Sequence, residues 1–260
     1  AEYTPFHTGH AYQIACTRQK LGEDCALVAV MSGHWVQGGR PAVVEKWTRA
    51  RMALVGGVDL VLELPTPWAA SSAESFARGA VGLLEGTGVV DVLSFGSECG
   101  DADKLRRIAV CLNSPEYGAG LRRFLDEGMP FAAARQGAVW GLLGRELAEL
   151  LSCPNNNLGV EYLRALDSWK SEIRPVTVRR EGAAHDSFLG EGERPRFCSA
   201  TQLRAFLEQG DWEAARPYLP SGGLEVLREN WSGFPSLNYV ERGILARLRT
   251  MTAEDWAAVP

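Results

Sequence analysis

The sequence predicts a doubly wound α/β fold, in which helices cover both faces of a mostly parallel β-sheet. Short, nearly continuous apolar and β-branched runs bounded by glycine and proline are typical of strands that are buried on both faces. The segments between these runs have helical periodicity, which gives repeated strand–helix–strand units. The predicted strands cover residues 25–31, 58–64, 89–95 and 173–179, and the helices between them cover 7–21, 43–56 and 70–86. Ligands of such sheets bind outside the carboxyl ends of the strands.

Two further parts of the chain, an insertion and a C-terminal segment, are predicted to contain helices without strands. These helices cover residues 104–112, 117–127, 131–150, 155–169 and 201–209, with a helix and the start of another in 239–258. The predicted division is an α/β domain from 1–100 and 152–200, a helical insertion at 101–151 and a truncated helical C-terminal segment at 201–260.

Composition is that of an ordinary globular protein able to bury a sizeable core. The chain has 260 residues, of which 46% are hydrophobic, and a net charge of −5. It has no apolar run of membrane-spanning length and no signal-peptide pattern, so a cytoplasmic location and no membrane partner are expected. The six cysteines have no C-x-x-C spacing, which favours reduced, mostly buried thiols over a zinc site or a disulfide framework. Nothing in the sequence predicts an oligomeric state.

The chain begins without methionine, at a point where a strand should be ending. We therefore expect the sequence to be a fragment whose missing first strand would lie centrally in the sheet. The last residues, 256–260, likewise resemble a cut within a helical segment.

The clearest chemical signal is the H-x-G-H element formed by His7, Thr8, Gly9 and His10 at the start of the first predicted helix. The first turn of a helix offers free backbone N–H groups and a positive dipole end, which together favour an anion such as a triphosphate. Gly9 leaves room for a phosphate or a base against the backbone. The alternative is that both histidines are ordinary residues of a helix start.

Other candidates follow the later strands. Gly96 could let adenine or ribose approach the sheet edge, or could be a simple turn glycine. Asn155 and Asn156 precede a helix, so one of them could be only an N-cap. Arg180 is placed to bind phosphate, whereas Arg179 on the alternate face is expected to be solvated.

Three further groups carry open alternatives. Ser199 and Thr201 could form a phosphate-binding loop, or Ser199 could be only an N-cap. Lys46 and Arg49, one helical turn apart, are either exposed surface residues or contacts for substrate or RNA. Basic residues are frequent in the helical insertion and could bind RNA phosphates, although arginines on helix surfaces are usually just solvated. These insertion residues are Lys104, Arg106, Arg107, Arg122, Arg123, Arg135 and Arg145.

Eight segments, in order along residues 1 to about 205, resemble the bacterial tRNA(Met) cytidine acetate ligase family. They are AEYTPFHTGH at 1–10, MSGHWVQ at 31–37, KWTRA at 46–50, DLVLELP at 59–65, SAESFA at 72–77, FGSE at 95–98, PNNNLG at 154–159 and SATQLR at 199–204. The resemblance implies a Rossmann-like nucleotidyltransferase fold of the type that carries an H-I-G-H element. Thr4 and His34 stand where the family commonly has Asn.

The resemblance also implies an activity. The expected enzyme uses ATP, with Mg²⁺, to activate acetate as acetyl-adenylate, and then transfers the acetyl group to N4 of the wobble cytidine of elongator tRNA(Met). The expected catalytic residues are His7 and His10, and no protein metal ligand is expected. The expected ATP-binding residues are Ala1, Glu2, Tyr3, Thr4, Pro5, Phe6, His7, Thr8, Gly9, His10, Ala11, Tyr12, Gln13, Gly96, Asn155, Asn156, Arg180, Ser199 and Thr201. The alternative functions are a small-molecule adenylyltransferase of the same class and a non-catalytic ATP-binding module.

Overall fold

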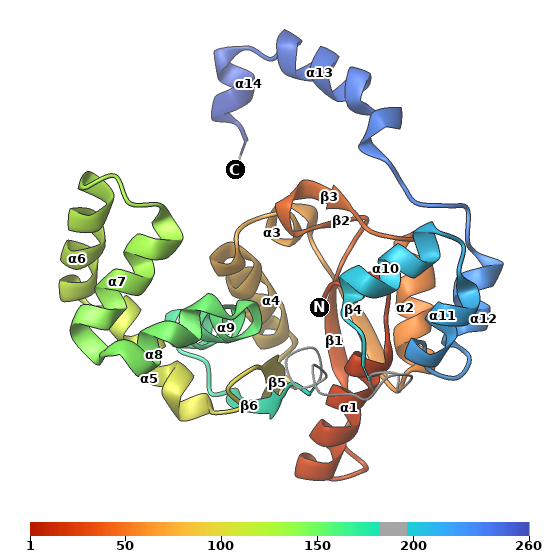
Figure 1. Ribbon diagram of the computed structural model, residues 1–260, viewed down its shortest axis with the longest axis horizontal. Coiled ribbons are helices and arrows are strands. Elements are labelled where there is room, and N and C mark those ends of the chain that lie inside the picture. The colour runs from red at the N-terminus through yellow and green to blue at the C-terminus, as the bar shows by residue number, and fades with distance from the viewer. Residues whose placement is uncertain (182–196, 260) are drawn as a thin grey trace, which may run out of the picture. The chain divides into compact units, whose positions relative to one another are not determined.

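The computed structural model describes residues 1–181 and 197–259, and its elements are labelled in Figure 1. The chain forms two compact units. Unit 1 consists of Ala1–Thr8, Leu27–Ser71 and Ser199–Pro260, and unit 2 consists of Gly9–Ala26 and Ser72–Cys198. This division differs from the one that the sequence suggests, and the predicted domains stay a prediction.

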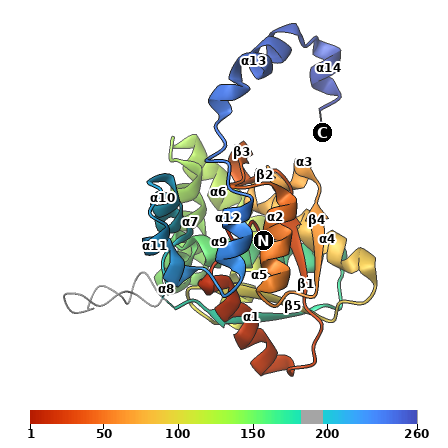
Figure 2. The same ribbon diagram turned by 90° about the vertical axis from the view of Figure 1, so that its right-hand side faces the viewer.

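Unit 1 is built around a parallel strand pair. Strand β1 (Val28–Ser32) pairs with β4 (Leu60–Leu64), and helix α2 (Lys46–Val55) packs against β4 and α12 (Gly223–Glu229), as Figure 2 shows from the side. The backbone of Ala1 lies next to β1, because the N–H of Ser32 donates to its carbonyl oxygen at 2.9 Å.

The other elements of unit 1 are short. They are β2 (Trp35–Val36), η1 (Gln37–Gly39), β3 (Arg40–Pro41), α3 (Thr66–Ala69), α10 (Ala200–Glu208), α11 (Trp212–Ala215), η4 (Arg216–Tyr218), η5 (Leu237–Tyr239), α13 (Glu241–Thr250) and α14 (Ala253–Ala257). Strands β2 and β3 form a small antiparallel hairpin. Each strand has only two residues, which is too short for an alternating pattern to be visible in the sequence.

Unit 2 contains a second parallel pair, β5 (Val92–Ser97) with β6 (Arg174–Arg179). Polar contacts join helix α1 (Thr8–Leu21) to these strands. The hydroxyls of Thr17 and Ser94 are 2.7 Å apart, and Lys20 donates to the carbonyl oxygen of Thr177 at 2.8 Å. Helices α4 (Ala73–Thr87) and α9 (Pro154–Trp169) pack along each other.

The helical part of unit 2 comprises α5 (Ala102–Leu112), α6 (Pro115–Asp126), α7 (Phe131–Leu143), α8 (Arg145–Glu149) and η2 (Leu150–Ser152). The prediction of one helix over 131–150 is wrong at Gly144. This residue has a φ of 85° and a ψ of 169°, which no helix accommodates and which glycine adopts without steric cost.

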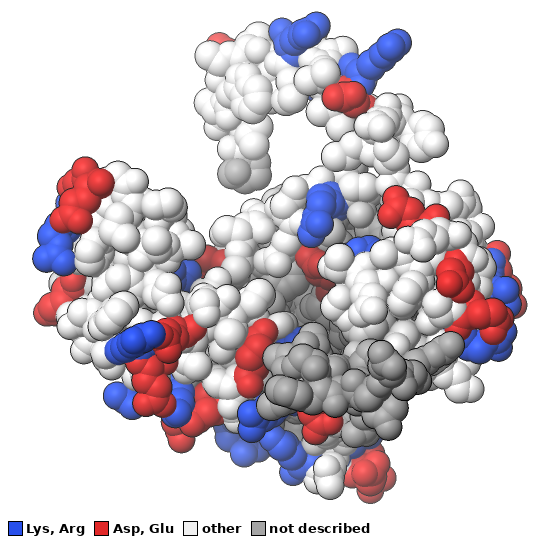
Figure 3. Space-filling view, in the orientation of Figure 1, with Lys and Arg blue, Asp and Glu red and all other residues white. Residues whose placement is uncertain are grey.

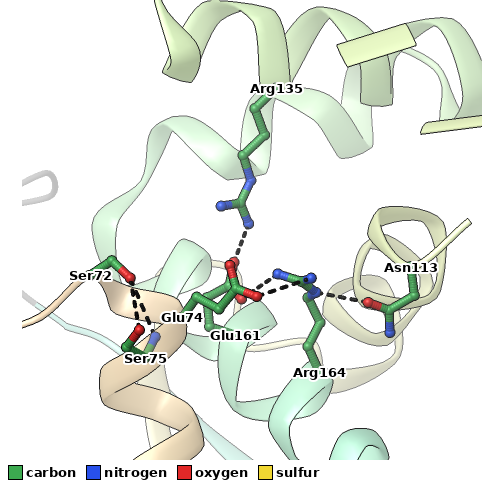
Figure 4. A network of polar contacts seen from close by, with 7 residues as sticks. All are labelled: Ser72, Glu74, Ser75, Asn113, Arg135, Glu161 and Arg164. Atoms are coloured by element: carbon green, nitrogen blue, oxygen red, sulfur yellow. Dashed lines mark hydrogen bonds and ion pairs between the residues drawn. The ribbon is translucent and has the colours of Figure 1, made fainter. Parts of the chain in front are cut away.

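A buried ion network joins the helical part to α9 (Figure 4). The carboxylate of Glu161, 1% exposed, accepts hydrogen bonds from Arg135 of α7 at 2.5 Å and from Arg164 of α9 at 2.8 Å. Arg164 also contacts the Asn113 side chain at 2.9 Å and Glu74 of α4 at 3.5 Å. The network therefore connects α9 to α7, to α4 and to the C-cap of α5. Removing one member would leave a buried charge without compensation.

The predicted strands and the α/β class are confirmed, with each strand shifted by one to three residues toward its carboxyl end at one or both boundaries. All six cysteines are free thiols, as expected. The expectation that most are buried is wrong, because only Cys111 and Cys198 are buried. Cys16, for example, lies on α1, a helix on which Thr17 is the buried residue.

Candidate nucleotide-binding site

The start of α1 has the features expected of an anion site. The helix begins at Thr8, directly after His7, and its first turn contains no acidic residue. The backbone N–H groups of this turn therefore meet no repelling carboxylate from their own helix. His7 is buried and His10 is half-buried.

In unit 1 the segment before α1 is held by a buried arginine. The guanidinium of Arg49, 0% exposed, donates to the carbonyl oxygens of Glu2 at 2.6 Å and Ser32 at 3.1 Å. It also donates to the carbonyl oxygens of Val44 and Gly33. Burial lowers the pKa of Arg49 to about 10, against the raising effect of nearby carboxylates, so the side chain stays charged at neutral pH.

The interpretation of Arg49 as an exposed surface residue is therefore wrong, because its side chain is fully buried. Its interpretation as a contact for substrate or RNA stays a prediction. Its guanidinium satisfies carbonyl groups where the N-terminal segment meets the carboxyl end of β1. Lys46, by contrast, forms an ion pair with Glu63 at 2.6 Å and is partly exposed.

Other side chains of the N-terminal segment contact neighbouring protein residues. Phe6 is fully buried and packs edge-on against Tyr3, with ring centroids 4.9 Å apart. The Glu2 carboxylate accepts from the N–H of Gln37 at 3.0 Å, and the Thr4 hydroxyl accepts from the N–H of Val43 at 3.3 Å. These contacts fix the backbone that leads into α1.

Ser199 and Thr201 lie at the start of α10, where both are exposed. The Ser199 hydroxyl caps the helix by accepting from the N–H of Gln202 at 3.1 Å, as the N-cap alternative predicts. The Thr201 hydroxyl accepts from Arg204 at 3.0 Å, and Arg204 also donates to the carbonyl oxygen of Thr4 at 3.1 Å. Burial and the nearby charge of Arg40 lower the pKa of Arg204.

Arg204 is thus a residue of this region that the site prediction missed. Its sequence signal is its position three residues after Thr201, which places both side chains on one face of α10. The contact connects α10 to the segment that precedes α1.

In unit 2, Gly96 lies inside β5 opposite Val178, so the interpretation as a turn glycine is wrong. A Cβ atom at this position would lie 3.5 Å from Cγ of Arg180 and 3.6 Å from Oε1 of Gln13, which is ordinary contact distance. Gln13 is itself tied to β5, because its amide donates to the carbonyl oxygen of Ser94 at 3.4 Å. Packing alone therefore does not require glycine at position 96. Because Gly96 has no side chain, the strand backbone is accessible between Gln13 and Arg180.

Arg179, the last residue of β6, and Arg180, which follows it, have different neighbours, as the alternation of a strand predicts. Arg180 is beside Gly96 and donates to Oδ1 of Asn155 at 3.4 Å. The Cβ of Arg179 packs instead against the backbone of Gly100.

Asn155 and Asn156 have different surroundings at the start of α9. Asn156 is 1% exposed, its Oδ1 accepts from the N–H of Cys99 at 3.0 Å, and its Nδ2 donates to the carbonyl oxygen of Leu150 at 3.2 Å. Asn155 is half-buried and contacts Glu98 and Arg180. Asn156 therefore holds the loop after β5, while Asn155 faces the arginine.

The remaining predicted residue with a described side-chain contact is Tyr12. Its hydroxyl donates to the Glu181 carboxylate at 2.8 Å, and hydrogen bonding with Cys16 and with Glu181 raises its pKa. The first turn of α1, directly before Tyr12, consists of Thr8, Gly9, His10 and Ala11. Unit 2 thus brings Gln13, Gly96, Asn155 and Arg180 together.

Acidic residues accompany the basic residues of the helical insertion. Residues 101–151 contain seven basic and seven acidic side chains, and Figure 3 shows the two signs interspersed over α5–α8. Ion pairs join Lys104 to Glu146, Arg106 to Asp167, Arg123 to Glu127, Arg135 to Glu161 and Arg145 to Glu149. Carboxylates therefore neutralise part of this positive charge locally, and RNA binding by the insertion stays a prediction.

The chain belongs to the HIGH nucleotidyl transferase family, whose model matches residues 1–260. This match and the parallel strand pairs confirm the predicted nucleotidyltransferase fold class. Among relatives, a protein of Caldanaerobacter subterraneus subsp. tengcongensis named tRNA(Met) cytidine acetate ligase is 46% identical over 229 residues. The alignment covers 87% of this chain and 56% of that relative.

Two solved structures are also similar. Thermotoga maritima TmcAL in its apo form I has a TM-score of 0.82 and 36% identity, over 96% of this chain and 61% of that one. Thermotoga maritima TmcAL bound with alpha-thio ATP has a TM-score of 0.78 and 38% identity, over 88% of this chain and 54% of that one. The chain thus spans little more than half the length of the relatives it matches.

Over residues 1–181 and 197–259, no helix combines the length and apolarity needed to cross a membrane. Within the same residues, no cluster of three or more His, Cys, Asp or Glu side chains is placed to hold a metal ion.

Proposed function

We propose that this chain is the nucleotide-binding part of an ATP-dependent acetate ligase that modifies the wobble cytidine of elongator tRNA(Met). The observation that carries the proposal is the 46% identity to a relative named tRNA(Met) cytidine acetate ligase. The alpha-thio ATP of the Thermotoga maritima structure supports ATP as the nucleotide. A cytoplasmic location is part of the proposal.

The chemistry has two steps. An acetate oxygen attacks the α-phosphorus of ATP, the bond to the β,γ-diphosphate breaks, and acetyl-adenylate and diphosphate form. The N4 amine of cytidine then attacks the acetyl carbon, AMP leaves, and the nitrogen loses a proton. The first step requires positioned reactants and donors for the negative charge that grows on the phosphate oxygens.

We assign these donors to the start of α1. His7 and His10 would donate hydrogen bonds to phosphate oxygens, and the N–H groups after Thr8 would add the attraction of the helix dipole. Gln13, Gly96, Asn155 and Arg180 would bind the adenosine part or the adjoining phosphate. Ser199, which caps α10, and Thr201 of its first turn are also proposed phosphate contacts.

The described residues offer no ligand set for a metal ion. We therefore propose only that Mg²⁺ arrives with ATP, and derive no step from it.

The test is incubation of the full-length protein with ATP, labelled acetate and elongator tRNA(Met), followed by nucleoside analysis. Acetylated cytidine, with AMP release that depends on acetate, is the expected result. An adenylylated small molecule would instead indicate the alternative adenylyltransferase. Binding of ATP without turnover would indicate a non-catalytic ATP-binding module.

A further inference from the structure

The Glu98 carboxylate accepts three hydrogen bonds from residues at the start of α9. Its Oε1 accepts from the backbone N–H of Asn155 at 3.2 Å and from the Asn155 side-chain Nδ2 at 2.7 Å. Its Oε2 accepts from the backbone N–H of Asn156 at 2.7 Å. One carboxylate therefore occupies the first turn of α9 and one side of the Asn155 amide.

The two neighbours of Asn155 leave its amide one orientation. The Glu98 carboxylate only accepts hydrogen bonds, so Nδ2 must face it. A guanidinium only donates, so Oδ1 must face Arg180, as the 3.4 Å contact has it. The atom that Asn155 presents on the side of Arg180 is thus an acceptor with a second lone pair.

The same geometry excludes a phosphate from the start of α9. The N–H groups that would bind it already donate to Glu98, and the carboxylate would repel a second anion. The ligand group that fits Asn155 is a neutral donor, which on ATP means a ribose hydroxyl or the adenine amino group.

We propose that Glu98 is a positioning residue for nucleotide binding, which acts by fixing the Asn155 amide so that Oδ1 accepts a hydrogen bond from the nucleoside part of ATP. The inference rests on the proposed function, because it takes ATP as the ligand. It adds a role for a residue that does not itself contact the nucleotide.

The experiment measures ATP affinity by calorimetry, and thermal unfolding, for the full-length protein. Glu98→Gln should weaken ATP binding about tenfold, because the amide can turn once one partner offers both a donor and an acceptor. Asn155→Ala should have a similar effect, and Glu98→Gln combined with Asn155→Ala should bind no more weakly than Asn155→Ala alone. Deoxy-ATP and inosine triphosphate distinguish a hydroxyl donor from the amino donor, since each lacks one of them.

Asp101 provides a matched control. Its carboxylate caps α5 by accepting from the N–H groups of Asp103 and Lys104, both at 3.0 Å, so Asp101→Asn also removes a capping charge. It should lower the thermal unfolding temperature as Glu98→Gln does, yet leave ATP affinity within about twofold.

A second combination separates positioning from folding. Asn155→Asp alone should weaken ATP binding, because two carboxylates would face each other. Adding Glu98→Gln should recover at least part of the affinity, because the Gln amide can donate to the new Asp.

Any of three results would overturn the role of Glu98. They are additive losses of ATP affinity in Glu98→Gln with Asn155→Ala, no recovery of affinity in Asn155→Asp with Glu98→Gln, and a loss of affinity in Asp101→Asn equal to that in Glu98→Gln. In each case the wild-type protein would still bind ATP, and the proposed function would stand. A wild-type protein that binds no ATP would overturn both.

Discussion

The starts of α1 and α9 are both helix N-termini near the carboxyl ends of parallel strands, yet they differ in the carboxylates close to their first turns. The first turn of α9 is capped by Glu98, an internal carboxylate. The first turn of α1 carries no acidic residue and follows a histidine. An internal carboxylate at a helix N-terminus therefore competes with a ligand anion for the same N–H groups, so helix N-termini of one fold can differ in their attraction for phosphate.

The strongest test of this comparison is His10→Ala. If the start of α1 binds the triphosphate, losing this donor should reduce acetate-dependent AMP release about 100- to 1000-fold, as for other donors that stabilise developing charge. Thermal unfolding should be unchanged within a few degrees, because the half-buried ring is not part of the core. A variant that releases AMP at close to the wild-type rate would remove α1 from the phosphate site.

The next test uses Arg179 and Arg180, at the carboxyl end of β6. Arg180→Ala should weaken ATP binding roughly 10- to 100-fold, because a charge-assisted hydrogen bond is lost. Arg179→Ala is the matched control and should change the affinity by less than about twofold, because Arg179 packs against Gly100 rather than beside Gly96. Equal losses in both variants would contradict the assigned faces.

The sequence predicts these elements because their signals are local. The apolar runs locate the strands, and the alternation of a strand separates Arg179 from Arg180 without any tertiary information. The contacts that arrange the site are not local. Glu98 and the Asn155 side chain that it binds are 57 residues apart, and Arg49 lies 47 residues after Glu2. A charged residue in a sequence does not reveal whether a distant carbonyl or amide will meet it.

Gly96 and Gly159 differ in the reason for which we expect a glycine: ligand approach at Gly96 and helix packing at Gly159. A Cβ at Gly159 of α9 would lie 2.7 Å from the ring of Phe95, so Gly159→Ala should cost about 1 kcal/mol of unfolding free energy, after the gain from better helix propensity. Gly96→Ala meets only ordinary contacts and should leave this free energy unchanged or slightly raised. It should nevertheless weaken ATP binding about two- to fivefold, since its methyl group narrows the approach to β5. Chemical denaturation and calorimetry measure the two effects. A loss of stability in Gly96→Ala without any loss of affinity would reverse the two roles.

The smallest effect is expected from the helical insertion, where the charges are balanced rather than concentrated. Replacing Arg106, Arg107, Arg122 and Arg123 with Ala should change the KM for tRNA by less than about twofold. Arg106 is paired with Asp167 at 2.9 Å and Arg123 with Glu127 at 4.0 Å, so these two side chains bring less uncompensated charge to a phosphate than unpaired arginines would. The salt dependence of tRNA binding is the more sensitive measurement, because each phosphate contact contributes to its slope. An unchanged slope would exclude the insertion as the main phosphate-binding surface. A slope that falls by about one for each arginine removed would show that RNA displaces the carboxylate partners, and the balance of charge on this surface would then not predict its ligand.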